Sequence, residues 1–150
     1  MRLTNLADYA VVVMTAAAKA CDSRLSAGSV AATTGLPVPT VAKLMGSLAK
    51  AGLLDSSRGV AGGFGLARAA SEISLADIVE AIDGPIALTS CAHDATASDC
   101  AISGGCAVKP HLSIVTRTVR DALDAVTLAQ LAGNEAAPLG ASAVPQFEEA

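Results

Sequence analysis

Aromatic side chains are almost missing from this chain: its 150 residues include no tryptophan, one tyrosine and two phenylalanines. A β-sandwich relies on aromatic and β-branched pairs across its strands, so this shortage argues against one. The apolar residues, 52% of the total, are mostly alanine, valine and leucine, which favours closely packed helices. A chain of this length forms one or two small domains, so a large enzyme is excluded. The composition predicts a mainly α protein.

Long hydrophobic runs are also absent. The longest strongly apolar stretch, residues 9–18, has ten residues between Asp8 and Lys19, whereas a helix that crosses a bilayer needs about 20. Arg2, this stretch and Cys21 loosely resemble a lipoprotein signal. However, Asp8 interrupts the front of the stretch, and Lys19 lies just before the place where cleavage would occur. The sequence therefore predicts no membrane partner and a cytoplasmic location.

Acidic residues outnumber basic ones by 14 to 10, but the two signs are unevenly distributed. Residues 1–70 carry seven basic and three acidic side chains, a net charge of +4. Residues 71–150 carry three basic and eleven acidic side chains, a net charge of −8. A basic head joined to an acidic body is typical of a DNA-binding domain with an attached sensing or dimerising part.

Three short helices and a hairpin are predicted in the head, followed by a fourth helix. Each helix has apolar residues at three- and four-residue spacing or recognisable end signals, in the form of serine, threonine, proline and glycine. Two strand-like segments flank a glycine-rich turn. Residues 1–84 therefore predict a winged helix-turn-helix domain. The predicted helices cover residues 3–20, 26–35, 39–52 and 74–84, and the strands cover 53–56 and 64–67.

The acidic body divides into three segments. Residues 85–109 lose all periodicity, and a loop this long is usually functional or disordered. From Pro110 onward, apolar residues repeat at spacings of three and four, which predicts a long dimerisation helix over 110–132. A helix that packs only on its own domain is the alternative. Residues 133–150 are rich in small residues and are predicted to be disordered. The seam of the long helix is Leu112, Val115, Val119, Ala122, Val126 and Ala129.

The outer face of the third helix is predicted to contact DNA. Two lysines on a helix usually form only a solvated face. In the second helix of a helix-turn-helix, however, this face meets the major groove, and small side chains beside the lysines can approach a thymine methyl group. The candidate contacts are Thr40, Ala42, Lys43, Ser47 and Lys50, with Arg2 as a further cation of the head.

The glycine-rich turn has the sequence Arg58-Gly59-x-x-Gly62-Gly63. No Lys-Ser/Thr pair follows it and it does not lead from a strand into a helix, so it is not a nucleotide-binding loop. In a wing, glycines allow close approach to the DNA backbone, and Arg58 can enter the minor groove. An ordinary hairpin turn is the alternative. Arg58, Gly59 and Gly62 join the candidate DNA contacts.

Three of the four cysteines lie in the loop, in the pattern Cys91-x8-Cys100-x5-Cys106. This spacing is too wide for a zinc knuckle of the C-x2-C type. A disulfide framework is disfavoured by the predicted cytoplasmic location. Iron–sulfur and zinc ligation both remain open, because each needs thiolates that converge from a flexible loop. The fourth cysteine, Cys21, is interpreted as a small core residue.

The combination of these motifs resembles the IscR/NsrR-type (Rrf-two) family of winged-helix regulators over roughly residues 1–132. Residues 36–43 look most like the members that control SUF iron–sulfur assembly. The resemblance rests on the opening Met1-Arg2-Leu3-Thr4 with Asp8-Tyr9-Ala10, the stretch Ala51-Gly52-Leu53-Leu54, the wing with Leu66-Ala67-Arg68, the segment Glu72-Ile73-Ser74-Leu75-x-Asp77-Ile78, and the three-cysteine loop.

This resemblance implies a homodimeric transcription factor whose cluster status alters its affinity for a palindromic operator, and it suggests repression of cluster-assembly genes. Cys91, Cys100 and Cys106 match the family's three ligands of an iron–sulfur cluster, with the two-iron and four-iron forms both open. IscR-like members have a histidine where this chain has Lys109. Asp8 matches the carboxylate that nitric-oxide-sensing relatives donate from the first helix of the partner subunit.

Several alternatives stay open at this point. His111 and His93 are substitutes for Asp8 as the fourth ligand. A zinc-stabilised or thiol-redox winged-helix regulator without a cluster is the second functional reading. An enzyme is not expected, because a cysteine nucleophile needs a positioned base and an oxyanion-binding pocket, and no such pocket is indicated.

Overall fold

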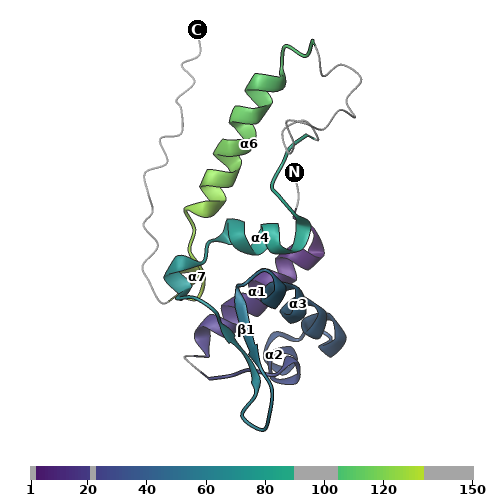
Figure 1. Cartoon of the computed structure of the whole chain (residues 1–150), viewed down its shortest axis with the longest axis vertical. Helices are drawn as coiled ribbons and strands as arrows, with labels where there is room; N and C mark the ends of the chain where they lie inside the picture. Colours follow the sequence, from purple (N-terminus) through teal and green to yellow (C-terminus); the bar gives the residue numbers. More distant parts are fainter. Residues whose placement is uncertain (1–2, 21–22, 90–104, 134–150) are drawn as a thin grey trace.

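The computed structural model describes residues 3–20, 23–89 and 105–133. Helices dominate, and the one sheet among the described residues has two antiparallel strands, so the predicted mainly α class with a small β-wing is confirmed. In chain order the elements are α1 (Asn5–Lys19), α2 (Ala27–Thr34), α3 (Val38–Lys50), β1 (Leu54–Ser57), β2 (Gly63–Leu66), the 3-10 turn η1 (Ala70–Glu72), α4 (Leu75–Asp83), α6 (Lys109–Asp124) and α7 (Leu128–Leu131) (Figure 1).

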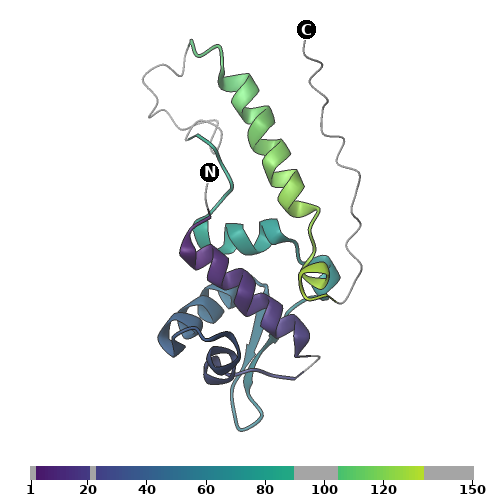
Figure 2. The same ribbon diagram turned by 180° about the vertical axis from the view of Figure 1, so that it is seen from behind.

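The hairpin and α6 lie at opposite ends of the molecule. Helices α1, α2 and α3 form a compact group from which the β1–β2 hairpin projects, and α4 lies across the other side of that group (Figures 1 and 2). Helix α6 extends away beyond α4, and α7 returns the chain to the group. The wing is therefore far from the N-terminal end of α6 (Figure 1).

The helix ends follow the sequence signals. The Thr4 side chain accepts a hydrogen bond from the Ala7 amide at 3.1 Å and caps α1. Ser26 caps α2, which ends at Gly35 in the left-handed conformation with φ of 76°. Ser74 and Asp77 form a reciprocal capping box at the start of α4. These contacts satisfy amide groups that a helix cannot pair internally.

The core of the winged domain is apolar and includes residues from most of its elements. The predicted stripe of α3, formed by Val41, Leu44, Met45 and Leu48, is buried against α1 and α2. Leu128 of α7 is fully buried in the same core, although it lies more than forty residues beyond α4 in the chain. The winged domain is therefore built from residues on both sides of the cysteine-containing segment.

The prediction of one continuous helix over 110–132 is wrong. Helix α6 ends at Asp124, and α7 begins at Leu128 after a break in which Thr127 caps the new helix. The Leu75 amide donates to the Val126 carbonyl at 2.8 Å, and the Leu128 amide donates to the Ile73 carbonyl at 2.8 Å. Val126 and Ala129 therefore belong to the winged domain and not to the seam of the long helix.

A capping motif explains this break. Thr127 Oγ1 accepts from the Gln130 amide at 3.2 Å, and Gln130 Oε1 accepts from the Thr127 amide at 3.1 Å. Thr-x-x-Gln is a capping-box sequence that signals a helix start. The prediction missed the boundary between α6 and α7, because the apolar spacing of three and four continues across the capping motif.

Candidate nucleic-acid interface and cysteine segment

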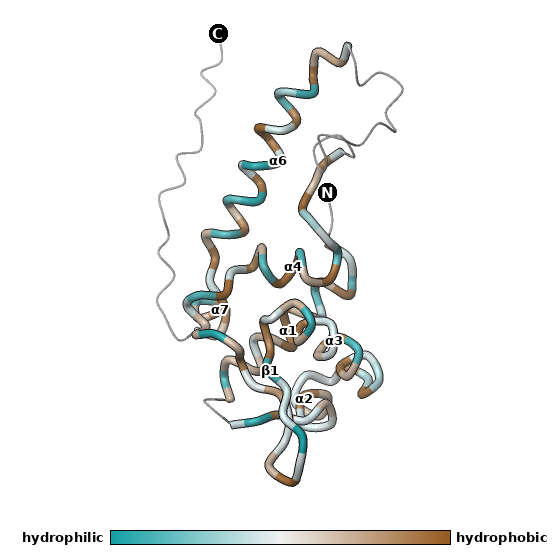
Figure 3. The backbone as a smooth tube through the Cα atoms, in the orientation of Figure 1, coloured by the Kyte–Doolittle hydropathy of each residue, from teal (hydrophilic) through white to brown (hydrophobic). Residues whose placement is uncertain are grey.

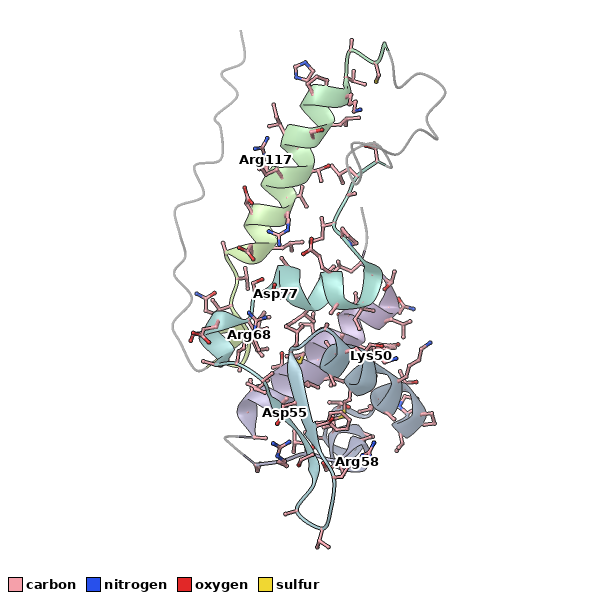
Figure 4. All side chains as sticks on the ribbon, in the orientation of Figure 1. Lys50, Asp55, Arg58, Arg68, Asp77 and Arg117 are labelled. Atoms are coloured by element: carbon pink, nitrogen blue, oxygen red, sulfur yellow. The ribbon has the colours of Figure 1, made fainter. Side chains whose placement is uncertain are left out.

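Helix α3 presents a polar face opposite its buried stripe. Ala42, Lys43 and Lys50 are exposed, while Thr40 and Ser47 are half-buried. Lys50 is at the end of this helix and Arg58 is on the hairpin (Figure 4). The structure therefore places the predicted α3 contacts on one accessible side of the helix.

The wing turn is shaped by its glycines. The Gly62 amide donates to the Gly59 carbonyl at 2.9 Å, and Gly59 has φ of 108°. A Cβ built on Gly62 would lie 2.5 Å from the Ser57 carbonyl oxygen, which is closer than real Cβ contacts. Gly59 and Gly62 are thus explained by the turn itself, whether or not they also approach DNA. Arg58 and Val60 are exposed in this turn.

Arg24 braces the base of the wing, a role that the sequence did not indicate. Its Nη2 lies 2.6 Å from Asp55 Oδ2, and its Nη1 donates to the Gly63 carbonyl at 3.2 Å. The adjacent Leu25 exchanges two backbone hydrogen bonds with Phe64, each 2.8 Å long. A single β-bridge therefore ties the segment before α2 to β2 and fixes the wing relative to the helices.

Among the residues that the structure describes, no carboxylate forms an ion pair with the cations of the candidate interface. Within the described ranges, the ion pairs are Arg24–Asp55, Arg68–Asp77 and Arg120–Glu80. None of them uses Lys43, Lys50 or Arg58. Exposed cations without such partners can bind an external polyanion such as the DNA backbone. Arg68 lies near α7 and Asp77 lies in the first turn of α4, apart from Lys50 and Arg58 (Figure 4).

The predicted loop over residues 85–109 is described at 85–89 and 105–109, and Cys106 is the one of its three cysteines that lies within these ranges. Cys106 is half-buried, and its carbonyl accepts from the Lys109 amide at 3.4 Å, so it lies just before α6. Asp8 in the first turn of α1 and His111 in the first turn of α6 are exposed. Over the described ranges, no three His, Cys, Asp or Glu side chains come together as a metal site. The predicted positions Arg2, Cys21, Cys91, His93 and Cys100 lie outside the described residues, as do residues 134–150 of the predicted tail.

Helix α6 carries apolar residues on a largely accessible surface. Ile114 is 54% exposed and Val115 is 47% exposed, while Leu112 and Val119 are half-buried. Apolar and polar residues alternate along this helix in Figure 3. Of the sixteen residues of α6, all described, only Thr116 is buried. Of the first four seam residues, Val115 and Ala122 are thus exposed, and Leu112 and Val119 are partly accessible. No helix among the described residues is long and apolar enough to cross a membrane.

Polar contacts join α6 to α4 and the residues that follow α4. Ser74 Oγ donates to Asp124 Oδ1 at 2.8 Å. Arg120 makes two hydrogen bonds to the Glu80 carboxylate, and hydrogen bonding together with the charge of Glu80 raises the pKa of Arg120 above its usual value. Sequence reasoning missed these residues, because their partners are 40 to 50 positions apart.

Comparisons with known proteins agree with this architecture. The model of the Rrf2 family, described as an iron-dependent transcriptional regulator, matches residues 3–134. An HTH-type transcriptional regulator of Mycobacterium tuberculosis is 33% identical over 135 residues, which are 89% of this chain and 82% of that protein.

Two solved structures are similar over most of the chain. CymR, the global cysteine regulator of B. subtilis, has a TM-score of 0.69 and 26% identity, and the match covers 90% of this chain and 98% of CymR. IscR of T. potens has a TM-score of 0.65 and 27% identity, and the match covers 93% of this chain and 92% of IscR.

Proposed function

The chain belongs to the Rrf2 family of transcriptional regulators, and we propose that it binds its operator as a homodimer and senses an iron–sulfur cluster. Helix α3 enters the major groove, and the wing contacts the backbone or the minor groove. The cluster is held by Cys91, Cys100 and Cys106. The proposed target of the protein is genomic DNA, which implies that the protein works in the cytoplasm.

The observation that carries the DNA-binding proposal is a group of exposed cations that form no ion pair with a described carboxylate. Lys43 and Lys50 on α3 and Arg58 on the wing are all exposed, and no ion pair between described residues engages them. Phosphate contacts supply most of the affinity for duplex DNA, so these three cations favour that partner. The small Ala42 beside Lys43 leaves room for close contact with base edges.

The homodimer is supported by the accessible apolar residues of α6. Val115 is about half exposed and Ala122 is exposed, on a helix whose other side faces α4. A second copy of α6 would cover these side chains. A two-fold dimer presents two copies of α3, so its operator is expected to be an imperfect palindrome.

The chemistry of the donor set fits an iron–sulfur cluster. Three thiolates are soft ligands of the type that such clusters require, and Cys106 is partly accessible. A harder fourth ligand would hold one iron less firmly, which suits a site that loses its cluster under oxidant, nitric oxide or iron shortage. Asp8 is the leading candidate because it is exposed on α1 and open to another subunit. His111 and His93 remain alternatives.

A thiol-sensing regulator without a cluster is the second candidate. It is favoured by the structural similarity to CymR, which is named a global cysteine regulator. A zinc site at the same cysteines is a variant of this candidate. Both variants keep the DNA-binding face and the dimer and differ only in what the cysteine segment binds.

One preparation separates these candidates. The protein is purified under strictly anaerobic conditions and analysed for iron, sulfide and zinc, together with its absorption spectrum. We expect equimolar iron and sulfide with a visible chromophore. Cys91→Ala, Cys100→Ala and Cys106→Ala should each abolish the chromophore, and Cys21→Ala should not. A colourless or zinc-loaded protein, or a chromophore that survives Cys100→Ala, would contradict the cluster.

The DNA target can be obtained without knowing the regulated genes. Wild-type protein selects a duplex from a randomised DNA library, and the recovered sequences are tested for two-fold symmetry. Control of SUF-type assembly genes, with repression as the direction, remains a prediction from family resemblance. Comparing affinity for the selected duplex with and without the cluster tests whether the cluster regulates binding.

A further inference from the structure

Glu80 connects three parts of the molecule. Its Oε1 accepts a hydrogen bond from Arg120 Nε at 3.1 Å, and its Oε2 accepts one from Arg120 Nη2 at 3.2 Å. The same Oε1 accepts from the backbone amide of Ile86 at 3.2 Å. The Glu80 side chain is 24% exposed and that of Arg120 is 41% exposed, so water screens the attraction between the charges and the two hydrogen bonds define the orientation. One carboxylate therefore joins α4, α6 and the segment that follows α4.

Two other polar contacts lie along the same side of α6. Ser74 Oγ donates to Asp124 Oδ1 at 2.8 Å, near the end of the helix. The Leu88 amide donates to Thr116 Oγ1 at 3.4 Å, one turn before Arg120, and Thr116 is the buried residue of α6. Helix α6 is thus held by hydrogen bonds at successive turns rather than by a buried apolar stripe.

A bidentate contact between arginine and a carboxylate restricts orientation more strongly than apolar packing does, because two parallel hydrogen bonds fix the plane of both groups. The 16 residues of α6 extend about 24 Å. A tilt of about 10° at α4 would therefore move the far end of α6 by about 4 Å, which exceeds the DNA rise of about 3.4 Å per base pair.

We propose that Glu80 is a positioning residue that sets the angle between α6 and the winged domain, and thereby the separation of the two α3 helices in the dimer. This inference rests on the proposed homodimer, but it does not require a cluster. The Ile86 amide also donates to the Glu80 carboxylate. A change in the position of the chain that leads into the cysteine segment would therefore alter the contact between Glu80 and Arg120.

The test compares the spacing preference of wild type and Glu80→Gln. Glutamine has nearly the same shape and can still accept from Ile86, but it removes the charge that pairs with Arg120. Affinity is measured for the duplex selected by wild-type protein and for versions with one base pair added or removed between the half-sites. Wild type should prefer the original spacing, and Glu80→Gln should reduce that preference at least threefold. Affinity for a single half-site should not change.

Two further variants separate positioning from stability. Glu72→Gln removes the same charge from the exposed η1 turn and should leave the spacing preference unchanged. Arg120→Gln should match Glu80→Gln, and the double variant should be no worse than either single variant, because both changes break one contact. If Glu80→Gln does not fold, Arg120→Lys provides the test, since it keeps the charge but loses the planar fork.

The outcomes are distinct. An unchanged spacing preference in a folded, dimeric Glu80→Gln protein would overturn the inference, as would independent and additive effects of the two single variants. A wild type that sediments as a monomer or shows no spacing preference would instead contradict the proposed dimeric function. Equal weakening of all duplexes, including the half-site, would show a general loss of stability and would also contradict a positioning role.

Discussion

At the scale of single residues, the candidate interface combines cations that are free to bind with glycines that the fold requires. Lys43 and Lys50 contribute nothing to the buried core, because they point away from the apolar stripe of α3. Gly62 is different, since its missing side chain makes room for the Ser57 carbonyl oxygen. Substitutions at these two kinds of position should therefore affect different measurements.

Lys43→Ala should weaken DNA binding without lowering stability. For a phosphate contact, the slope of log affinity against log salt concentration should fall by about one. For a base contact, the preference at one position of the duplex should relax instead. Lys109→Ala removes the same charge at the start of α6, far from the wing, and is the matched control. Unchanged binding by both Lys43→Ala and Arg58→Ala would contradict the placement of the interface.

Gly62→Ala should destabilise the hairpin. The added Cβ would lie 2.5 Å from the Ser57 carbonyl oxygen and 2.8 Å from that of Gly59, so the backbone of the turn must shift. We expect a loss of about 1–3 kcal/mol in the free energy of unfolding, measured by denaturant titration. Gly65→Ala in β2 is the control, because no atom within 4 Å meets its Cβ. Equal stability of the two variants would show that the turn tolerates the side chain.

At the scale of elements, short segments far apart in the chain hold the wing and α7 in place. The Leu25–Phe64 pairing extends the hairpin on one side, and the Ser74–Thr127 bridge joins the start of α4 to the residue before α7. Each bridge fixes an element of only four residues, which is too short to be stable alone. The elements that define the winged domain therefore depend on contacts with distant segments.

Thr127→Ala should lower stability by about 1 kcal/mol, because it removes the side-chain cap of α7 and leaves an amide unpaired. Thermal or denaturant unfolding of the purified protein measures this loss. Thr118→Ala, at an exposed position in the middle of α6, is the control and should change stability by less than about 0.5 kcal/mol. If Thr127→Ala caused no loss, the break between α6 and α7 would need another explanation.

At the scale of the whole molecule, the candidate DNA-binding face and the candidate dimer surface lie toward opposite ends. The hairpin lies at one end and α6 extends toward the other (Figure 1), where Ile114 and Val115 are exposed apolar residues of α6. Helix α4 connects them through Glu80 and Ser74. Dimerisation through α6 would therefore leave both basic faces free for DNA.

Val115→Asp tests the dimer surface. Val115 is 47% exposed in the single chain, so the monomer should tolerate aspartate, whereas a covering subunit would bury the charge at considerable cost. Sedimentation should show a dimer for wild type at micromolar concentration and a monomer for the variant. Arg117→Asp places the carboxylate at an exposed position on the opposite side of α6, because residues two apart do not share a helix face, and this variant should remain dimeric. A wild-type monomer with full affinity for the selected duplex would defeat the dimer proposal.

Local signals in the sequence determined most of the elements and the exposed face of α3 that we propose as the DNA contact. The caps at Thr4, Ser26 and Ser74 act within three residues, and the apolar stripe of α3 follows the helical period, so both can be predicted without tertiary contacts. The exposed side of α3 then follows as the face opposite the stripe. The family resemblance rested on the same local motifs.

Only the tertiary structure decided which segments meet. The spacing of apolar residues continues from α6 into α7, although these are two separate helices. The change of direction between them places Leu128 in the core of the winged domain, with Thr127 as the cap of α7. Arg24 pairs with Asp55 across 31 positions, and Glu80 pairs with Arg120 across 40. A single sequence carries no periodic or capping signal for such pairs, because their energy arises only after the helices have packed.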